Sequence, residues 1–267
     1  LMHGMEVDYY KKLFQTIGNI IELIEKDDIP KYLLFLENAF PYMDNYNYHK
    51  GMNGIIQELT GLLKTKNIGT DSDRALLLDF QATLEIKPEK AIKLEKDALA
   101  QIENITADNA RLVSNLHANL GGLYRMNGHP DLAREHMEKS ISLLDQFNLL
   151  HINDSIPQIA NYAMFLTEQQ EPERGISELQ KLSGIIKEYH SDDCLDYAKV
   201  QETLGTIYLM TANLPQAKTH FKRAFKIYEK IWADEPEMIE AKYQEIQELY
   251  PQIGFCIGKN LSGLLTK

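Results

Sequence analysis

The chain has 267 residues and a formal net charge of −11, because 39 Asp and Glu residues outnumber 28 Lys and Arg residues. Hydrophobic residues make up 44% of the chain and charged residues 25%, which is typical of a globular protein with a sizeable core and excludes general disorder. The net acidity opposes binding to phosphate backbones and anionic lipids, and no basic patch in the sequence offsets it. We therefore expect neither nucleic acid nor a membrane as a partner.

The cysteines and the chain start bear on cellular location. Cys194 and Cys256 lie far apart in sequence, which argues against a disulfide framework and fits a reducing compartment. No apolar run approaches the roughly 18 residues of a membrane span, and residues 1–5 lack the features of a signal peptide. A cytoplasmic location is expected. Because residue 1 is leucine rather than an initiator methionine, these inferences concern this segment only.

Residues 1–70 are predicted to form helices that precede a repeat array. Apolar residues recur at helical spacing over 10–24, and further helices are predicted over 32–40 and 51–64, with a break at 67–71. These helices are either degenerate repeats or a helical cap. Their lengths and pairing favour degenerate repeats.

Residues 71–233 contain four copies of one repeat. The segments 118–146, 160–188 and 202–230 align at a shift of 42 residues, and a weaker copy covers 75–104. Internal repetition at such a period is typical of repeat architectures. The most regular columns are Leu120, Tyr162 and Leu204; Gly121, Ala163 and Gly205; Tyr124, Leu166 and Tyr208; and Ala133, Gly175 and Ala217.

Prolines mark the same period. Pro88, Pro130 and Pro172 are 42 residues apart, and Pro215 is one residue late. Each is expected in the first turn of a helix, where the missing N–H is not needed. Apolar residues recur every three or four positions on both sides of each proline, so each repeat is predicted to be a pair of helices. The sequence therefore predicts an all-α fold.

Small residues recur on both helices of each predicted pair. Gly121 and Gly205 on first helices are expected to face Ala133 and Ala217 on second helices. A larger side chain at these positions would push the two backbones apart.

The spacing of these columns resembles the tetratricopeptide repeat, in which Leu-Gly is followed by Tyr and then by Ala in the second helix. His117, Ile159 and Gln201 occupy the tryptophan column of that pattern, and the period of 42 exceeds the usual length of about 34. The extra residues after the second helix resemble the kinesin-light-chain subtype. So do the Asn-Leu-Gly and Asn-Tyr-Ala motifs that begin at Asn119 and Asn161. Bacterial proteins also carry that subtype, so the resemblance implies a fold and not a transport role; we expect a bacterial source. The resemblance implies a right-handed α-solenoid.

Residues 234–267 are predicted to close the array with capping helices. The stretch 234–248 carries six acids and one lysine, and 253–265 is its apolar partner. Repeat arrays need such terminal caps for solubility.

Motifs for chemistry are weak. The tripeptide at 129–131 matches that of J-domain co-chaperones, but it occupies a repeat turn where proline has a structural role. Residues 254–260 resemble a phosphate loop that is one residue short and lacks a preceding strand, and the eight histidines form no H-E-x-x-H motif. We expect no enzyme activity, metal or cofactor.

The resemblance implies that the first helices line a concave groove for an extended peptide or a partner helix. Asn side chains can bond both the C=O and the N–H of such a peptide, so Asn119 and Asn161 are expected to hold its backbone. The alternative is that they bond within the array. Only Asn161 and Lys199 match the clamp that holds acidic chaperone tails, which argues against that ligand. The expected groove residues are Asn115, Asn119, Gly122, Arg125, Met126, Asn161, Met164, Thr167, Glu168, Lys199, Glu202, Thr206 and Met210.

The sequence thus predicts a non-catalytic scaffold that binds a protein or peptide segment in its concave groove. The alternative is a peptide- or signal-sensing regulatory domain of a larger bacterial regulator or signal-transducing ATPase. The sequence indicates no oligomeric state.

Overall fold

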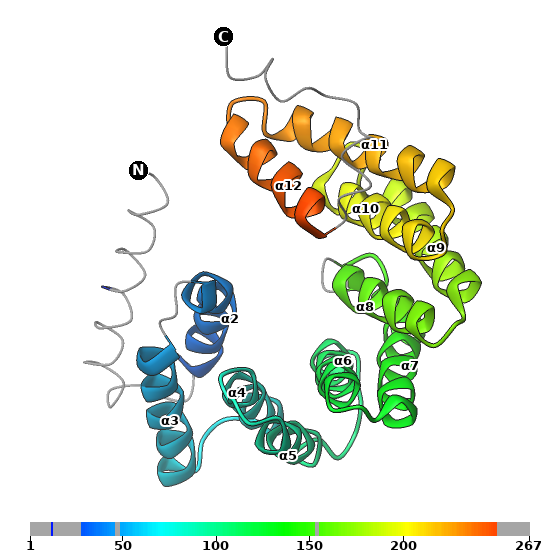
Figure 1. The fold of residues 1–267 in the computed structure, drawn as a ribbon. Coiled ribbons are helices and arrows are strands. Elements are labelled where there is room, and N and C mark those ends of the chain that lie inside the picture. Colours follow the sequence, from blue (N-terminus) through cyan, green and yellow to red (C-terminus); the bar gives the residue numbers. More distant parts are fainter. Residues whose placement is uncertain (1–11, 13–27, 46–48, 153–154, 250–267) are drawn as a thin grey trace. The chain divides into compact units, whose positions relative to one another are not determined.

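The computed structural model describes residue 12 and residues 28–45, 49–152 and 155–249 (Figure 1). All regular elements in these ranges are helices, which confirms the predicted all-α class. The predicted helices over 10–24 and 253–265 lie outside the described residues. The helices are α2 (Ile29–Asn45), α3 (His49–Lys66), α4 (Asp71–Thr83), α5 (Pro88–Leu99), α6 (Ala110–Met126), α7 (Pro130–Gln146), α8 (Ser155–Glu168), α9 (Pro172–Tyr189), α10 (Leu195–Met210), α11 (Leu214–Ile231) and α12 (Pro236–Leu249).

The chain divides into two compact units, Leu1–Leu143 and Leu144–Lys267, and the boundary falls near the end of α7. We call them unit 1 and unit 2. Within the units, α4 packs on α5, α8 on α9 and α10 on α11, which confirms the predicted helix pairs. None of the described helices is long and apolar enough to cross a membrane.

Proline and a left-handed residue fix the turn inside each pair. Pro88, Pro130 and Pro172 are the first residues of α5, α7 and α9, and Pro215 is the second residue of α11, as predicted. The turns before the last three of these prolines each contain a residue with positive φ. Those residues are Gly128, Gln170 and Ala212, each 42 positions after the previous one.

The same turns share a backbone hydrogen bond that caps the preceding helix. The N–H groups of His129, Glu171 and Asn213 donate to the carbonyl groups of Tyr124, Leu166 and Tyr208, at 2.9, 2.8 and 2.7 Å. A left-handed residue followed by such a bond is the Schellman ending, which satisfies carbonyls that the helix leaves unpaired. The turns before Pro130, Pro172 and Pro215 therefore form by the same local mechanism.

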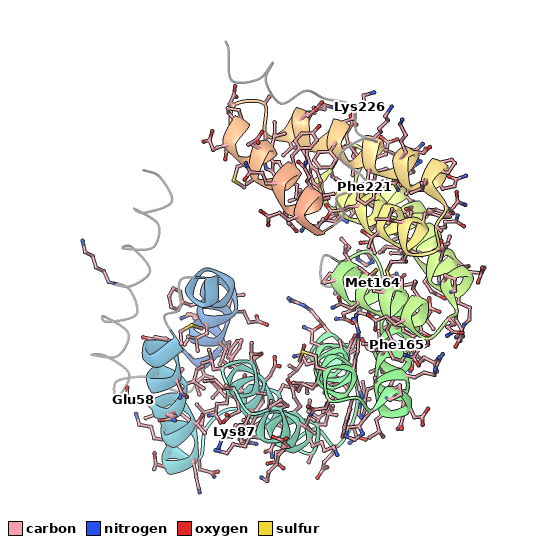
Figure 2. All side chains as sticks on the ribbon, in the orientation of Figure 1. Glu58, Lys87, Met164, Phe165, Phe221 and Lys226 are labelled. Carbon is pink, nitrogen blue, oxygen red and sulfur yellow. The ribbon has the colours of Figure 1, made fainter. Side chains whose placement is uncertain are left out.

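Glycine sets how closely paired helices approach. A Cβ atom on Gly121 would lie 2.6 Å from Cγ of Met137 and 3.3 Å from the carbonyl oxygen of Ala133, as the predicted close approach requires. A Cβ atom on Gly205 would lie 2.8 Å from the ring of Phe221, which packs between α10 and α11 (Figure 2). At these positions only hydrogen fits without displacement of the second helix.

In two repeats, polar pairs replace the missing tryptophan of the usual pattern. In unit 1, Nδ1 of His117 lies 2.9 Å from Nδ1 of His136, so one ring donates and the other accepts. Burial lowers the pKa of His117 to about 4, and it also lowers the pKa of His136. In unit 2, Nδ1 of His220 lies 2.9 Å from Oε1 of Gln201 at the corresponding positions. Hydrogen bonds between helices thus occupy a place that an indole ring fills in the usual repeat.

Candidate functional site

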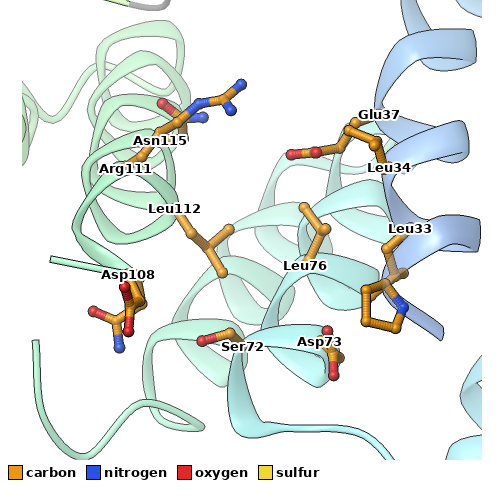
Figure 3. A pocket seen from close by; sticks show the side chains of 12 residues that line it. Leu33, Leu34, Glu37, Ser72, Asp73, Leu76, Asp108, Arg111, Leu112 and Asn115 are labelled. Carbon is orange, nitrogen blue, oxygen red and sulfur yellow. The ribbon is translucent and has the colours of Figure 1, made fainter. Parts of the chain in front are cut away.

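A cavity of about 280 Å³ lies in unit 1 between α2, α4 and α6 (Figure 3). These are the first helices of three consecutive helix pairs, and α4 packs against both α2 and α6. Residues spaced three or four positions apart share one face of a helix, so each helix contributes one row of side chains to the cavity. Of the groove residues that the sequence predicts, Asn115 on α6 lines this cavity.

Leucine side chains form the floor of the cavity. Leu33 is buried, Leu76 and Leu112 are half-buried, and Leu34 remains 59% exposed. Leu76 and Leu112 point into the space between α2 and α6 (Figure 3). An exposed aliphatic side chain beside a concave apolar floor is a typical feature of ligand sites.

Polar side chains from opposite helices flank this floor. Glu37 lies on α2, whereas Arg111 and Asn115 lie across the cavity on α6 (Figure 3). Asp73 also lines the cavity, but its carboxylate accepts a 2.6 Å hydrogen bond from the N–H of Thr70 and so caps α4. The α2 wall thus presents the Glu37 carboxylate, whereas the α6 wall presents Arg111 and Asn115 together with the Asp108 carboxylate just before the helix.

A carboxyl pair lies between α4 and α5, with Asp79 on α4 and Glu95 on α5. The Glu95 side chain on α5 is 1% exposed, and its Oε2 atom finds no hydrogen-bond partner as a carboxylate. Burial, together with the nearby Asp79 carboxylate, raises the pKa of Glu95, and a protonated Glu95 can donate to Asp79. Nδ2 of Asn119 donates to Oδ1 of Asp79 at 2.8 Å. Burial also raises the pKa of Asp79, and the charge of Glu37 in the cavity wall adds to that rise.

The predicted groove residues of unit 1 have different surroundings. Asn115 lines the cavity. Asn119 bonds Asp79 within the array, the alternative that the sequence left open for this side chain. Arg125 is half-buried, and Met126 is 74% exposed at the end of α6.

The predicted groove residues of unit 2 lie on α8 and α10, which pack against each other. Asn161 is exposed and Met164 half-buried on α8. On α10, Thr206 is half-buried, and Nζ of the exposed Lys199 lies 3.7 Å from a carboxylate oxygen of Asp196 in the same helix.

Glu202, also predicted to face the groove, connects three helices of unit 2. Its carboxylate lies 2.9 Å from Nζ of Lys242 on α12 and accepts a 2.6 Å hydrogen bond from the hydroxyl of Tyr228 on α11. Burial lowers the pKa of Lys242, but the carboxylates of Glu202 and Glu245 together outweigh this effect and the net pKa is raised. Burial and Glu202 both raise the pKa of Tyr228. Glu202 therefore contributes to the attachment of α12.

Sequence reasoning missed the α2 side of the cavity and one basic surface. Leu34 and Glu37 lie in a helix that shares no repeat columns, although their spacing of three residues already places them on one face. The expectation that the chain has no basic patch is wrong, because α11 exposes a row of five basic side chains. These are Lys218, Lys222, Arg223, Lys226 and Lys230. The spacing of four residues between the lysines was the signal available in the sequence.

The described residues contain no group of three or more His, Cys, Asp or Glu side chains placed to hold a metal ion.

Comparisons with known proteins agree with the fold of this chain. Residues 155–230 match the family model of the tetratricopeptide repeat. A search of curated proteins gives no significant match.

Solved structures with a similar fold include kinesin-light-chain repeats. Nearly identical TPR-like repeats of a kinesin light chain from Podosopora anserina match with a TM-score of 0.61 at 13% identity, over 79% of this chain and 99% of that one. A second structure of such repeats gives a TM-score of 0.58 at 14% identity, over 73% and 93%. BtubC (BKLC) from P. vanneervenii gives 0.51 at 18% identity, over 76% and 74%. These comparisons confirm the predicted fold and its likeness to the kinesin-light-chain repeats.

Proposed function

Since residues 155–230 match the family model of the tetratricopeptide repeat, we propose that the chain is a non-catalytic scaffold whose cavity between α2, α4 and α6 binds a peptide or protein segment. The observation that carries the proposal is the exposed Leu34 side chain beside a leucine floor, with Glu37 on one wall and Arg111 and Asn115 on the other. This arrangement combines an apolar anchor site with polar groups that orient a ligand.

The leucine floor supplies affinity. An apolar side chain of the ligand would cover Leu34, Leu76 and Leu112, and removal of an exposed leucine from water is worth on the order of 1–2 kcal/mol. Because the floor is built on three helices, the anchor site is positioned before the ligand arrives. Such preorganisation lowers the entropic cost of binding.

The walls supply orientation. Arg111 has N–H donors for the ligand's carbonyl or carboxylate groups, and the amide of Asn115 can pair with the ligand backbone in either sense. On the opposite wall, Glu37 accepts hydrogen bonds or pairs with a basic group. A segment that presents an apolar side chain between an acidic and a basic end would satisfy all three surfaces.

The proposal extends to unit 2 through the predicted residues that face its groove. In that unit, Asn161 and Met164 on α8, with Lys199 and Thr206 on α10, would contact a peptide or protein segment. We further propose a cytoplasmic location, which the separated cysteines support.

A phage-displayed peptide library, panned on the full chain, tests the cavity. We expect the selected peptides to share an apolar anchor, and their affinities to fall roughly tenfold or more in the variants Leu34→Ser and Arg111→Gln. Both side chains are exposed, so the fold should survive the changes. The matched control is Leu214→Ser, which removes a similarly exposed leucine from unit 2. Failure to select any peptide, or selected peptides that bind the cavity variants normally, would refute the proposal.

A further inference from the structure

Helix α11 carries a row of basic side chains on its solvent face. Lys218, Lys222, Lys226 and Lys230 follow one another at intervals of four residues, and all four are exposed. Residues four apart are neighbours on a helix surface, about 6 Å apart along the axis. Lys226 points away from α10 and α12 (Figure 2). We call these four lysines, with the exposed Arg223 beside them, the basic row.

The core fixes the orientation of this row. The opposite face of α11 buries Phe221, Ala224, Phe225 and Tyr228. The ring of Phe225 stacks on Tyr243 of α12, with 4.1 Å between ring centroids. The helix cannot rotate without exposing these rings, so the lysines stay directed to solvent.

Most of the row is not neutralised within the chain. Lys218, Lys222 and Lys226 form no ion pair with any residue that the structure describes. Lys230 pairs with Asp193, whose pKa that hydrogen bond lowers. The one acid on α11 is Glu229, and its carboxylate accepts a hydrogen bond from the hydroxyl of Tyr243. A strongly basic surface thus persists in a chain whose net charge is −11.

The row works against the stability of its own helix. Like charges at a spacing of four residues destabilise a helix, and the row contains three such pairs in succession. Lys218 also lies near the positive N-terminal end of the α11 dipole. An anionic partner that covers the row would remove both penalties.

We propose that the basic row binds an acidic helical segment of a partner protein. Glutamates at every fourth residue of a partner helix repeat at the same interval as the lysines, so several pairs can form in register. Leu214 and Ile231, at the two ends of α11, are 47% and 41% exposed and add apolar contacts. This surface belongs to unit 2 and is separate from the cavity of unit 1.

Other anionic partners fit less well. For a nucleic acid, the row offers few phosphate contacts. An anionic membrane favours helices with a free apolar face, whereas α11 buries its apolar face in the core.

The test measures binding of a fluorescent alanine-based helical peptide with glutamate at every fourth position, by fluorescence anisotropy with the full chain. We expect saturable binding that weakens with added salt. The double variant Lys222→Glu, Lys226→Glu should weaken binding roughly tenfold or more. The matched control is Lys87→Glu, Lys90→Glu, which makes the same charge change at exposed lysines around the start of α5 and should bind normally.

Further arms separate the alternatives. The same peptide with glutamine in place of glutamate should not bind. A short DNA duplex or phosphatidylserine vesicles that bind more tightly than the peptide, with the same lysine dependence, would overturn the assignment to a protein segment. Sedimentation that shows lysine-dependent dimerisation of the chain by itself would also overturn this assignment. Absence of peptide binding, or equal loss in the two double variants, would overturn the site itself.

Discussion

Replacement of Glu95 by glutamine should stabilise unit 1 at neutral pH. The buried Glu95 carboxyl lies against Asp79 and can make a hydrogen bond there only if it carries a proton. The glutamine amide has nearly the same shape and donates to Asp79 without taking up a proton. The variant therefore keeps the contact and removes the cost of protonation.

The magnitude follows from the proton that the wild-type chain must take up. Glu95 has an ordinary pKa of 4.5, so the unfolded chain is ionised there at pH 7, whereas the folded chain holds the acid neutral. The difference of 2.5 between pH 7 and that pKa corresponds to about 3 kcal/mol. At pH 5 the same cost is below about 1 kcal/mol. Because the pKa is raised on folding, the stabilisation is complete below pH 4.5 and is lost as the pH rises towards the folded-state pKa.

Hydrogen exchange read by mass spectrometry measures this effect locally. The free energy of opening is compared between wild type and Glu95→Gln for peptides that span α4 to α6, at pH 5 and at pH 7. We expect the variant to gain up to about 3 kcal/mol at pH 7 and much less at pH 5. Peptides from α10 and α11 in unit 2 are the internal reference and should not change.

Two results would refute the reasoning. The first is an equal gain at both pH values, because a proton-linked cost must grow with pH. The second comes from infrared spectroscopy: if the C=O band of a protonated carboxylic acid at pH 7 is the same in wild type and variant, Glu95 is not the protonated group.

Two further predictions concern the helix pairs. Gly205→Leu should destabilise unit 2 by roughly 1–3 kcal/mol or more, because the new side chain meets the Phe221 ring. The measurement is urea unfolding, monitored by the fluorescence of the single tryptophan. An unchanged midpoint of unfolding would contradict the prediction. For His117, the pKa is lowered on folding, so unit 1 should lose stability as the pH falls from 6.5 towards 4. At pH 5 the free energy of unfolding should fall by at most about 2 kcal/mol. Solvent screening reduces this loss further because the ring is only partly buried. His117→Gln should accept the bond from His136, as Gln201 does in unit 2, and should reduce this pH dependence in the same exchange experiment. An unchanged pH dependence would show that His117 does not carry it.

The sequence by itself determined where the helices of the repeats begin and how they pair. Pro130 and Pro172 start helices because a proline restricts its own backbone, a local effect that needs no tertiary contact. Gly121 and Gly205 indicated close crossings because only hydrogen fits there. The likeness to tetratricopeptide repeats followed from the same columns. Local conformational preferences and periodic burial suffice for these features.

Only the tertiary structure decided which side chains meet. The cavity joins Leu34 of α2 to Arg111 of α6, and the sequence between them gives no sign of the contact. Asn119 was predicted to hold a peptide, yet its amide bonds Asp79, because the neighbouring helix places a carboxylate within reach. The periodicity of a helix tells which face is buried but not what that face meets. Partners on other helices depend on how the helices pack, and the contacts of a site are therefore settled by the tertiary structure.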